Sequence, residues 1–318
     1  MSESHSIPLP VVLGPTGSGK SDLSLSIARA LDGEIVNCDS VQVYRGFDVG
    51  TAKVPLAERQ NVPHHLIDIV EPTDLFTAGD YARRAEAVIR EISARGRIAV
   101  LVGGTGFYLR GLLEGLSPGP ARDDALRARL LEREQRRPGS LHRILVRLDP
   151  ASALRIHPND KNKTMRALEV RLLEGAPLTA MFERGRAPLQ GFVPVKIGLD
   201  PPRDLLYIRL NERAQRMFFP EVSRESLADE VRRLLSAGVP PGAKPFESLG
   251  YKQALQMLQG RSTAEQALES TQQETRRYAK RQQTWFRREH GVHWIAGFGN
   301  DPRVQAEALA ILRRAGAA

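Results

Sequence analysis

The most constraining feature of this chain is a glycine-rich segment that lies between an apolar run and an amphipathic pattern. Residues 14 to 21 read GPTGSGKS and match the phosphate-binding pattern G-x-x-x-x-G-K-[ST]. The apolar run at 11 to 13 is typical of a buried strand, and Leu23, Ile27 and Leu31 recur afterwards at helical spacing. The segment therefore has the strand, loop and helix context in which such a loop binds phosphate.

Each part of this loop has a physical role in binding an anion. Its glycines let successive backbone N–H groups point inward, Lys20 adds a positive charge, and the following helix turns its positive end toward the same spot. Ser21 is placed to offer a hydroxyl ligand to Mg²⁺. The predicted diphosphate-binding residues here are Gly14, Pro15, Thr16, Gly17, Ser18, Gly19, Lys20 and Ser21. The loop predicts a ligand that carries a diphosphate, and it does not name a reaction.

The charge of the chain indicates a second kind of partner. The formal net charge is +9 over 318 residues. A protein that binds only small phosphates needs a few local cations, whereas a polyanion favours a surplus of cations spread over the surface. Nucleic acid is therefore a candidate partner.

Several classes of protein are not expected. No run reaches the roughly 18 to 20 apolar residues of a membrane span, and residues 1 to 10 lack the pattern of a signal peptide, so we expect a cytoplasmic protein without a membrane segment. Cys38 is the single cysteine, which excludes an internal disulfide and a multi-cysteine zinc site. We expect a buried Cys38 at a strand end, and metal binding, where it occurs, through oxygen ligands.

Two further strands are expected to end in polar residues. Residues 34 to 38 predict a short strand that delivers Asp39 and Ser40 at its carboxyl end, where ligands bind in open α/β sheets. Residues 98 to 102 are a near-continuous apolar run of the parallel, doubly covered kind, and they lead into a second glycine-rich turn that contains Thr105. The predicted fold class is α/β, with a P-loop-containing parallel sheet covered by helices.

The chain is expected to leave this sheet and return to it. Residues 1–116 are predicted to form the first part of the P-loop α/β core. Residues 117–191 show helical periodicity and dense charge without a good strand, which predicts an inserted all-helical subdomain. Residues 192–318 are predicted to complete the core with one strand at 193–199, where Pro194 indicates a sheet edge or a strand start, and to be helical in the remainder.

The predicted helix at 275–288 mixes cations with aromatic side chains. They are Arg276, Arg277, Lys280, Arg281, Arg287 and Arg288 among Tyr278, Trp285 and Phe286. Cations beside aromatic rings suit a phosphate backbone and a stacked base. An amphipathic helix with its aromatic residues in the core and its cations in solvent would have the same composition. The sequence leaves these two interpretations open.

The residues alone do not select the reaction. A kinase or NTPase is expected to have a second apolar strand that ends in an aspartate holding Mg²⁺ for phosphoryl transfer. Here the strands are followed by Asp39 and Thr105. At the mouth of the loop Asp39 is either a Mg²⁺ ligand or a general base toward an acceptor.

A series of short motifs, in their order and spacing, resembles the bacterial tRNA dimethylallyltransferases. The motifs lie at 14–21, 39–40, 50–53, 101–108, 112–116, 157–160, 166–169, 249–251 and 279–285. The resemblance implies transfer of a dimethylallyl group from dimethylallyl diphosphate to N6 of the adenosine next to the anticodon in tRNA, which gives N6-isopentenyladenosine. It also implies Mg²⁺ as cofactor and tRNA as partner, and we expect a monomer.

The resemblance implies roles for single residues. Thr105 is expected to hydrogen-bond near the reacting amine or the leaving oxygen, a role compatible with a simple helix cap, and Lys20 and Arg213 are expected to bind the diphosphate. Contacts with tRNA are implied for Asp39, Ser40, Val41, Gln42, Thr105, Arg127, Asn162, Lys163, Thr164, Met165, Arg166, Glu247, Ser248, Leu249, Gly250, Tyr251 and Lys252.

This chemistry fits the residue types. The exocyclic amine of adenine is a poor nucleophile because its lone pair is delocalised, so it needs a proton acceptor, for which Asp39 is the candidate. A stacked adenine does not reach a loop inside a protein, so the base has to be flipped out. The alternatives are an isopentenyltransferase that acts on AMP or ADP, a small-molecule P-loop kinase, and a nucleic-acid-binding module with a non-catalytic loop.

Overall fold

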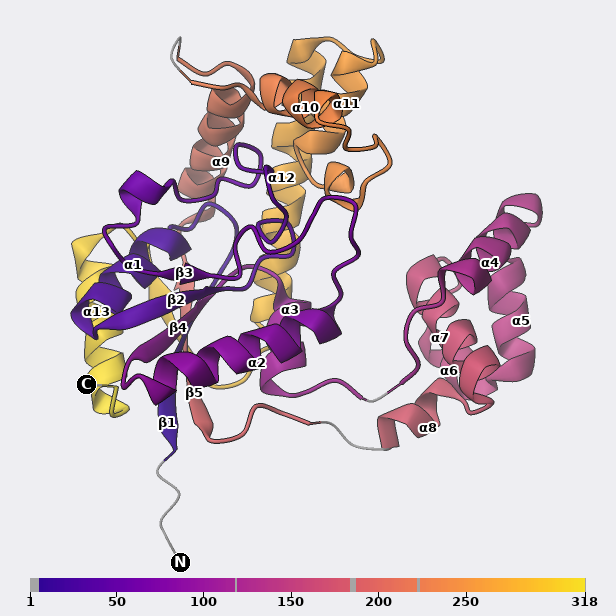
Figure 1. The fold of residues 1–318 in the computed structure, drawn as a ribbon, viewed down its shortest axis with the longest axis horizontal. Helices are drawn as coiled ribbons and strands as arrows, with labels where there is room; N and C mark the ends of the chain where they lie inside the picture. Colours follow the sequence, from indigo (N-terminus) through magenta and orange to yellow (C-terminus); the bar gives the residue numbers. More distant parts are fainter. Residues whose placement is uncertain (1–5, 118, 184–186, 222–223, 318) are drawn as a thin grey trace, which may run out of the picture. The chain divides into compact units, whose positions relative to one another are not determined.

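The computed structural model describes residues 6–117, 119–183, 187–221 and 224–317, and within them six strands form one parallel sheet (Figure 1). The strands are β1 (Ile7–Leu13), β2 (Gly33–Asn37), β3 (His64–His65), β4 (Ile98–Val102), β5 (Phe192–Asp200) and β6 (Val292–Ala296). Their order across the sheet is β3-β2-β4-β1-β5-β6. The predicted α/β class with a parallel sheet is confirmed.

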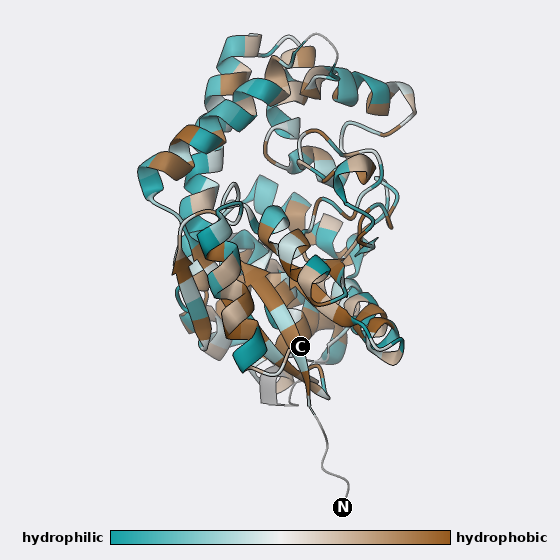
Figure 2. Ribbon diagram, turned by 90° about the vertical axis from the view of Figure 1, so that its left-hand side faces the viewer, coloured by the Kyte–Doolittle hydropathy of each residue, from teal (hydrophilic) through white to brown (hydrophobic). Residues whose placement is uncertain are grey.

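Both faces of the sheet are covered, as a parallel sheet requires. Helices α1 (Lys20–Ala30) and α13 (Pro302–Arg314) pack against each other and against one face, and α2 (Ala78–Ala94) packs on β2 and β4 beside α3 (Gly106–Leu113). The predicted apolar stripe of α1 is confirmed, since Leu23 and Ile27 are fully buried in the core cluster that includes Leu31. Figure 2 shows the strands as hydrophobic and many outer helix turns as hydrophilic.

A group of helices lies beyond the carboxyl ends of the strands in Figure 1. It comprises α9 (Arg203–Phe218), α10 (Leu227–Ser236), the 3₁₀ turn η2 (Lys244–Glu247), α11 (Tyr251–Leu258) and α12 (Ala264–Phe286). The helices pack in sequence, α10 on α11, α11 on α12 and α12 on α9. A further 3₁₀ turn, η1 (Leu56–Glu58), lies in the long connection between β2 and β3. This group brings late parts of the chain to the edge of the sheet where ligands bind.

Residues 114–188 form a second compact unit, and residues 1–113 with 189–318 form the first. The described part of the second unit contains α4 (Asp124–Arg136), α5 (Ser140–Leu148), α6 (Pro150–Arg155), α7 (Lys161–Glu174) and α8 (Leu178–Glu183), and no strand. Its own apolar core includes Leu130, Leu141, Leu145 and Leu168. The sequence had indicated helices and no strand at 117–191.

The end of the chain differs from the sequence prediction. Residues after 200 were expected to be helical, yet β6 adds a sixth strand that pairs with Lys196–Asp200 of β5. Only Ile295 of β6 is buried, at 2% exposure, as befits an edge strand. Pro194 is the third residue of β5 and precedes the stretch that pairs with β6, so the lack of an N–H costs no bond on that side. The strand-start interpretation of Pro194 is confirmed.

The carboxyl ends of β2 and β4 approach closely at Gly103. A Cβ atom on Gly103 would lie 2.0 Å from the carbonyl oxygen of Cys38 and 2.7 Å from its Cβ. The N–H of Cys38 donates to the carbonyl of Val102 at 2.6 Å, and Cys38 is 1% exposed, as expected for a buried cysteine at a strand end. This contact fixes the two polar turns after these strands relative to each other.

We predict that Gly103→Ala destabilises the protein, because its methyl group has no room beside the backbone of Cys38. Overpacking of this kind costs about 1–3 kcal/mol or more. Gly242→Ala is the matched control, since no atom lies within 4 Å of its ideal Cβ, and it is expected to change the free energy of unfolding by less than about 0.5 kcal/mol. Denaturant unfolding of both variants tests this, and equal unfolding midpoints would contradict it.

Candidate active site

A cavity of about 270 Å³ lies where the phosphate loop meets the carboxyl ends of β2 and β4. Among the residues that line it are Thr16, Lys20, Ser21, Asp39, Gln42 and Arg213. These come from the predicted diphosphate loop, the turn after β2 and helix α9. The structure therefore brings residues from both predicted substrate sites to one cavity.

The phosphate loop has the backbone conformation that anion binding requires. Gly17 and Gly19 have φ angles of 79° and 84°, in the left-handed region that favours glycine. Gly19 is the N-cap residue of α1, and the first N–H groups of a helix have no partner within it. These donors and the positive end of α1 make the loop an anion site.

Two cations reach the loop in poorly hydrated surroundings. The Nζ of Lys20 donates to the carbonyl of Pro15 at 2.9 Å, and burial lowers the pKa of Lys20 to about 8, against the opposing effect of Asp39. Arg213 donates to Thr16 Oγ1 at 2.9 Å. Burial, together with a neighbouring arginine, lowers the pKa of Arg213 to about 10. A bound diphosphate would favour the charged form of both groups.

The turn after β2 orients the carboxylate of Asp39. Its Oδ1 accepts hydrogen bonds from the N–H groups of Val41, at 2.8 Å, and Gln42, at 3.2 Å. The Nε2 of Gln42 donates in turn to the carbonyl of Thr51 at 3.0 Å. Strand β4 lies between β2, which precedes Asp39, and β1, which precedes the phosphate loop. Asp39 is therefore one strand further from the loop than it would be if β1 and β2 were neighbours. Asp39 nevertheless lines the same cavity as Lys20.

Thr105 connects the turns after β2 and β4. The N–H of Ser40 donates to Thr105 Oγ1 at 3.1 Å, and the hydroxyl of Thr105 approaches Ser40 Oγ at 3.4 Å. Thr105 also stands at the start of α3, where its carbonyl accepts from the N–H groups of Tyr108 and Leu109. Its position at a helix start is confirmed, while its hydroxyl bonds across to the turn that contains Asp39.

Gln282 of α12 is a residue that sequence reasoning missed. It is 7% exposed, its Oε1 accepts from the N–H of Thr16 at 2.7 Å, and its Nε2 donates to the carbonyl of Gly104 at 2.9 Å. In the sequence, Gln282 stands out only as part of the motif at 279–285. Its place among cations and aromatic side chains gave no sign that it would reach two backbone atoms of the site.

The predicted RNA contacts at 247–252 differ in how far they are exposed. Glu247 and Lys252 are exposed, Ser248 and Leu249 are partly buried, and Gly250 is buried. Tyr251 is fully buried, and its hydroxyl donates to Glu230 and accepts from the N–H of Gly50. Burial raises the pKa of Glu230 to about 7. Tyr251 thus packs under the connection between β2 and β3, and its ring does not face solvent.

In the second unit, Arg127 and Arg166 share one buried carboxylate. Arg127 contacts both oxygens of Glu169 at 2.8 Å, and Arg166 donates to Oε2 at 2.6 Å. Burial alone would raise the pKa of Glu169, yet the hydrogen bonds from the two arginines lower it to about 2. The side chains of Arg127 and Arg166 stay partly exposed, at 25% and 33%. They are therefore held rigidly at the surface of this unit.

The other implied contacts of this unit lie on the first turns of α7. Asn162 and Lys163 are exposed, and Lys163 pairs with Asp160 at 2.8 Å. Thr164 and Met165 are buried, at 1% and 9% exposure. Within 162–166 only part of the predicted set is at the surface.

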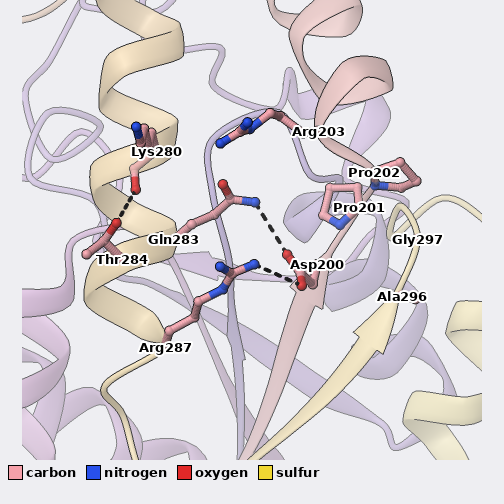
Figure 3. A pocket seen from close by; sticks show the side chains of 10 residues that line it. All are labelled: Asp200, Pro201, Pro202, Arg203, Lys280, Gln283, Thr284, Arg287, Ala296 and Gly297. Carbon is pink, nitrogen blue, oxygen red and sulfur yellow. Dashed lines mark hydrogen bonds and ion pairs between the residues drawn. The ribbon is translucent and has the colours of Figure 1, made fainter.

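A second hollow, of about 540 Å³, lies between α12 and the ends of β5 and β6 (Figure 3). Lys280 and Gln283 of α12 and Arg287, which follows the helix, line it together with Arg203 and Asp200. Asp200 accepts from Gln283 Nε2 at 3.3 Å and pairs with Arg287 at 3.5 Å. The hollow therefore presents three cations and one carboxylate.

The aromatic residues of α12 have different surroundings. Phe286 is buried at 1% exposure, as the amphipathic interpretation expects, whereas Trp285 is 37% exposed. The guanidinium of Arg110 lies 4.8 Å from the centre of the Trp285 ring. The nucleic-acid interpretation of this helix stays a prediction.

The cavity offers a modest donor set for Mg²⁺. Within the described residues no three acidic, histidine or cysteine side chains gather into a metal site. Mg²⁺ is commonly bound by one or two protein groups together with water and substrate phosphates. The hydroxyl of Ser21 and the carboxylate of Asp39, which both line the cavity, fit that pattern.

No helix in the described part of the chain is long and apolar enough to cross a membrane.

The parallel sheet and the loop between β1 and α1 define a P-loop protein of the α/β class, with a carboxylate across the cavity from the loop. A sequence model of the family described as IPP transferase matches residues 42–289. The chain therefore belongs to the IPP transferase family, as the motifs predicted.

Individual relatives agree with this assignment. The chain is 56% identical over 303 residues to a tRNA dimethylallyltransferase of Solibacter usitatus. The aligned residues make up 95% of this chain and 97% of the relative. A crystal structure of the tRNA isopentenylpyrophosphate transferase from Bacillus halodurans is similar with a TM-score of 0.70 and 36% identity, over 98% and 96% of the two chains. A eukaryotic dimethylallyltransferase acting on tRNA has a TM-score of 0.80 and 26% identity, over 98% and 80%.

The lowered pKa of Lys20 predicts how anion binding depends on pH. Below about pH 8 the ammonium is charged, and above it the free site loses this charge, so binding of inorganic diphosphate must then take up a proton. We expect the affinity to fall by up to about tenfold per pH unit above 8. Calorimetric titration with inorganic diphosphate between about pH 7 and about pH 9, roughly one unit on either side of this pKa, measures the change in affinity.

Lys20→Arg is the control for this measurement, because a guanidinium stays charged throughout that range. Its remaining pH dependence reports the ionisation of diphosphate itself. Parallel profiles for the two proteins would show that Lys20 does not titrate in the free site.

Proposed function

We propose that this protein transfers a dimethylallyl group from dimethylallyl diphosphate to N6 of the adenosine next to the anticodon in tRNA. The observation that carries the proposal is the single cavity lined by both Lys20 of the phosphate loop and Asp39 of the turn after β2. A leaving-group site thereby faces a proton acceptor. The names of the relatives support the same reaction.

The donor side of the cavity suits a departing diphosphate. As the carbon–oxygen bond breaks, positive charge grows on the allylic carbon and negative charge on the leaving oxygen. The N–H groups at the start of α1, with Lys20 and Arg213, are donors fixed in place before the reaction, which is how proteins stabilise developing charge. Mg²⁺ held by Ser21, Asp39 and the diphosphate would add to this charge stabilisation.

The acceptor side suits an exocyclic amine. The carboxylate of Asp39 accepts the proton as the new carbon–nitrogen bond forms, and the turn fixes its orientation through the N–H groups of Val41 and Gln42. The hydroxyl of Thr105 lies at hydrogen-bonding distance from the same turn, next to the proposed position of the amine. The adenosine reaches this position by flipping out of the anticodon loop.

Exposed cations and polar groups provide the RNA surface of the proposal. Lys280 and Arg287 at the hollow of Figure 3 suit backbone phosphates. In the second unit the rigidly held Arg127 and Arg166 are proposed to contact tRNA. The buried Tyr251, Thr164 and Met165 then support neighbouring RNA contacts through packing. We propose that the protein acts on tRNA in the cytoplasm as a monomer.

The rival functions have less support. An isopentenyltransferase for AMP or ADP shares the loop and Asp39, but the relatives are named for tRNA. A small-molecule kinase is expected to hold Mg²⁺ with an aspartate after a second apolar strand. The first polar side chain after the apolar strand β4 is instead Thr105.

The test is an acceptor assay. Purified protein is incubated with Mg²⁺, dimethylallyl diphosphate labelled in its prenyl group, and unmodified tRNA, AMP or ADP. We expect label in tRNA and none in the mononucleotides. Label in AMP or ADP alone would favour the rival prenyltransferase, and hydrolysis of ATP without prenyl transfer would favour a kinase.

We predict that Asp39→Ala lowers the rate of prenyl transfer by about 10²- to 10⁴-fold, the usual contribution of a positioned general base. The affinity for tRNA is expected to change little, because one carboxylate contributes little to a phosphate-dominated interface. Single-turnover rates and filter binding of labelled tRNA measure the two quantities. A variant with a near-normal rate would remove Asp39 from the role of base.

A further inference from the structure

We propose that Gln282 is a positioning residue that sets the separation between the donor loop and the acceptor turn. The proposal rests on the proposed function, because it concerns the geometry of the same transfer. Gln282 bonds to the backbone N–H of Thr16 and to the backbone carbonyl of Gly104, so it acts on the two loops. It lies outside the residues that the motifs implied for catalysis or binding.

Gln282 uses both ends of its side-chain amide. The Oε1 atom accepts from the N–H of Thr16 in the phosphate loop at 2.7 Å. The Nε2 atom donates to the carbonyl of Gly104, in the turn after β4, at 2.9 Å. The carboxamide group of glutamine carries a hydrogen-bond acceptor and a hydrogen-bond donor in one rigid plane. A single side chain thus spans the two glycine-rich segments.

The hydrogen bonds of Gln282 continue, through neighbouring residues, to the proposed base. Gly104 precedes Thr105, whose hydroxyl oxygen accepts from the N–H of Ser40 at 3.1 Å. Ser40 follows Asp39, the proton acceptor of the proposed reaction. A continuous chain of hydrogen bonds and adjacent residues therefore runs from Thr16 of the donor loop through Gln282 to Asp39.

Gln282 is itself held in place by the packing of α12. It lies between Ala279 and Phe286 on α12, which are 0% and 1% exposed, so its stretch of the helix is packed into the core. The side-chain amide of Gln282 also packs tightly against the turn after β4, because a Cβ on Gly104 would lie 2.4 Å from the Nε2 of Gln282. A side chain fixed at its base and at both polar atoms can define a distance. A buried amide that lost these partners would carry a desolvation penalty.

The contacts of Thr16 affect where the donor binds. Thr16 is bound from two sides, through its N–H by Gln282 and through its hydroxyl by Arg213. The N–H of Thr16 is already used, so the diphosphate is left to the N–H groups further along the loop. Gln282 thereby decides where along the loop the diphosphate lies, and hence how far the allylic carbon stands from the amine.

The experiment compares two substitutions of Gln282 with a control on the same helix. Gln282→Met keeps the length of the side chain and removes both hydrogen bonds. Gln282→Glu keeps an acceptor for the N–H of Thr16 and removes the donor to the carbonyl of Gly104. Gln273→Met is the matched control, because Gln273 is an exposed glutamine of α12.

We expect the single-turnover rate of prenyl transfer, with donor and tRNA saturating, to fall by about 10²-fold in Gln282→Met, the loss that a misplacement of about 1 Å causes. The affinity for tRNA is expected to stay within about twofold, as for the control. Rates are taken below the thermal midpoint of each variant and divided by the folded fraction, so a loss of stability alone does not lower them. Binding of inorganic diphosphate is expected to weaken in both Gln282 variants.

Each outcome decides one point. A normal rate per folded molecule in Gln282→Met would overturn the positioning role and leave the proposed function standing. If Gln282→Met does not fold, Gln282→Glu carries the test, and a normal rate and diphosphate affinity there would overturn the role as well. If wild-type protein transfers no prenyl group to tRNA, the proposed function fails together with the role of Gln282 in it.

Discussion

Parallel pairing of β1, β4 and β2 is the constraint on which the site depends. Parallel strands deliver their carboxyl ends to one edge, so the phosphate loop, the Gly103 turn and the Asp39 turn meet there without any helix having to place them. The close approach of Gly103 to Cys38 then removes the freedom between the last two turns. The proposed catalytic groups, which come from separate parts of the chain, acquire fixed distances because the sheet register is fixed.

The helices beyond the sheet change the chemistry of that edge. Arg213 from α9 and Gln282 from α12 both bond to Thr16, so the phosphate loop is enclosed by segments that follow it by almost two hundred residues or more. Enclosure removes water from Lys20, which lowers its pKa and leaves its charge poorly compensated until an anion binds.

Local patterns predicted much of this site, and non-local contacts escaped them. Residues 14–21, Asp39 and Thr105 follow strands directly, so a strand pattern and a polar residue located them. Gln282 escaped because its partners are backbone atoms 266 and 178 residues away. The edge strand β6 escaped because five residues with one buried side chain show little periodicity. Resemblance assigned RNA contacts by position, and it did not distinguish the buried Tyr251 from its exposed neighbour Lys252.

The second unit has an attachment with its own consequence. The chain leaves the first unit after Leu113 and re-enters it at Leu189, and the N–H of Leu189 donates to the carbonyl of Leu112 at 3.1 Å. This hydrogen bond holds the point where the chain leaves the first unit next to the point where it returns. An insertion joined in this way can vary in length and sequence without shifting the register between β1 and β5, so the unit proposed to contact tRNA can diversify while the sheet stays constant.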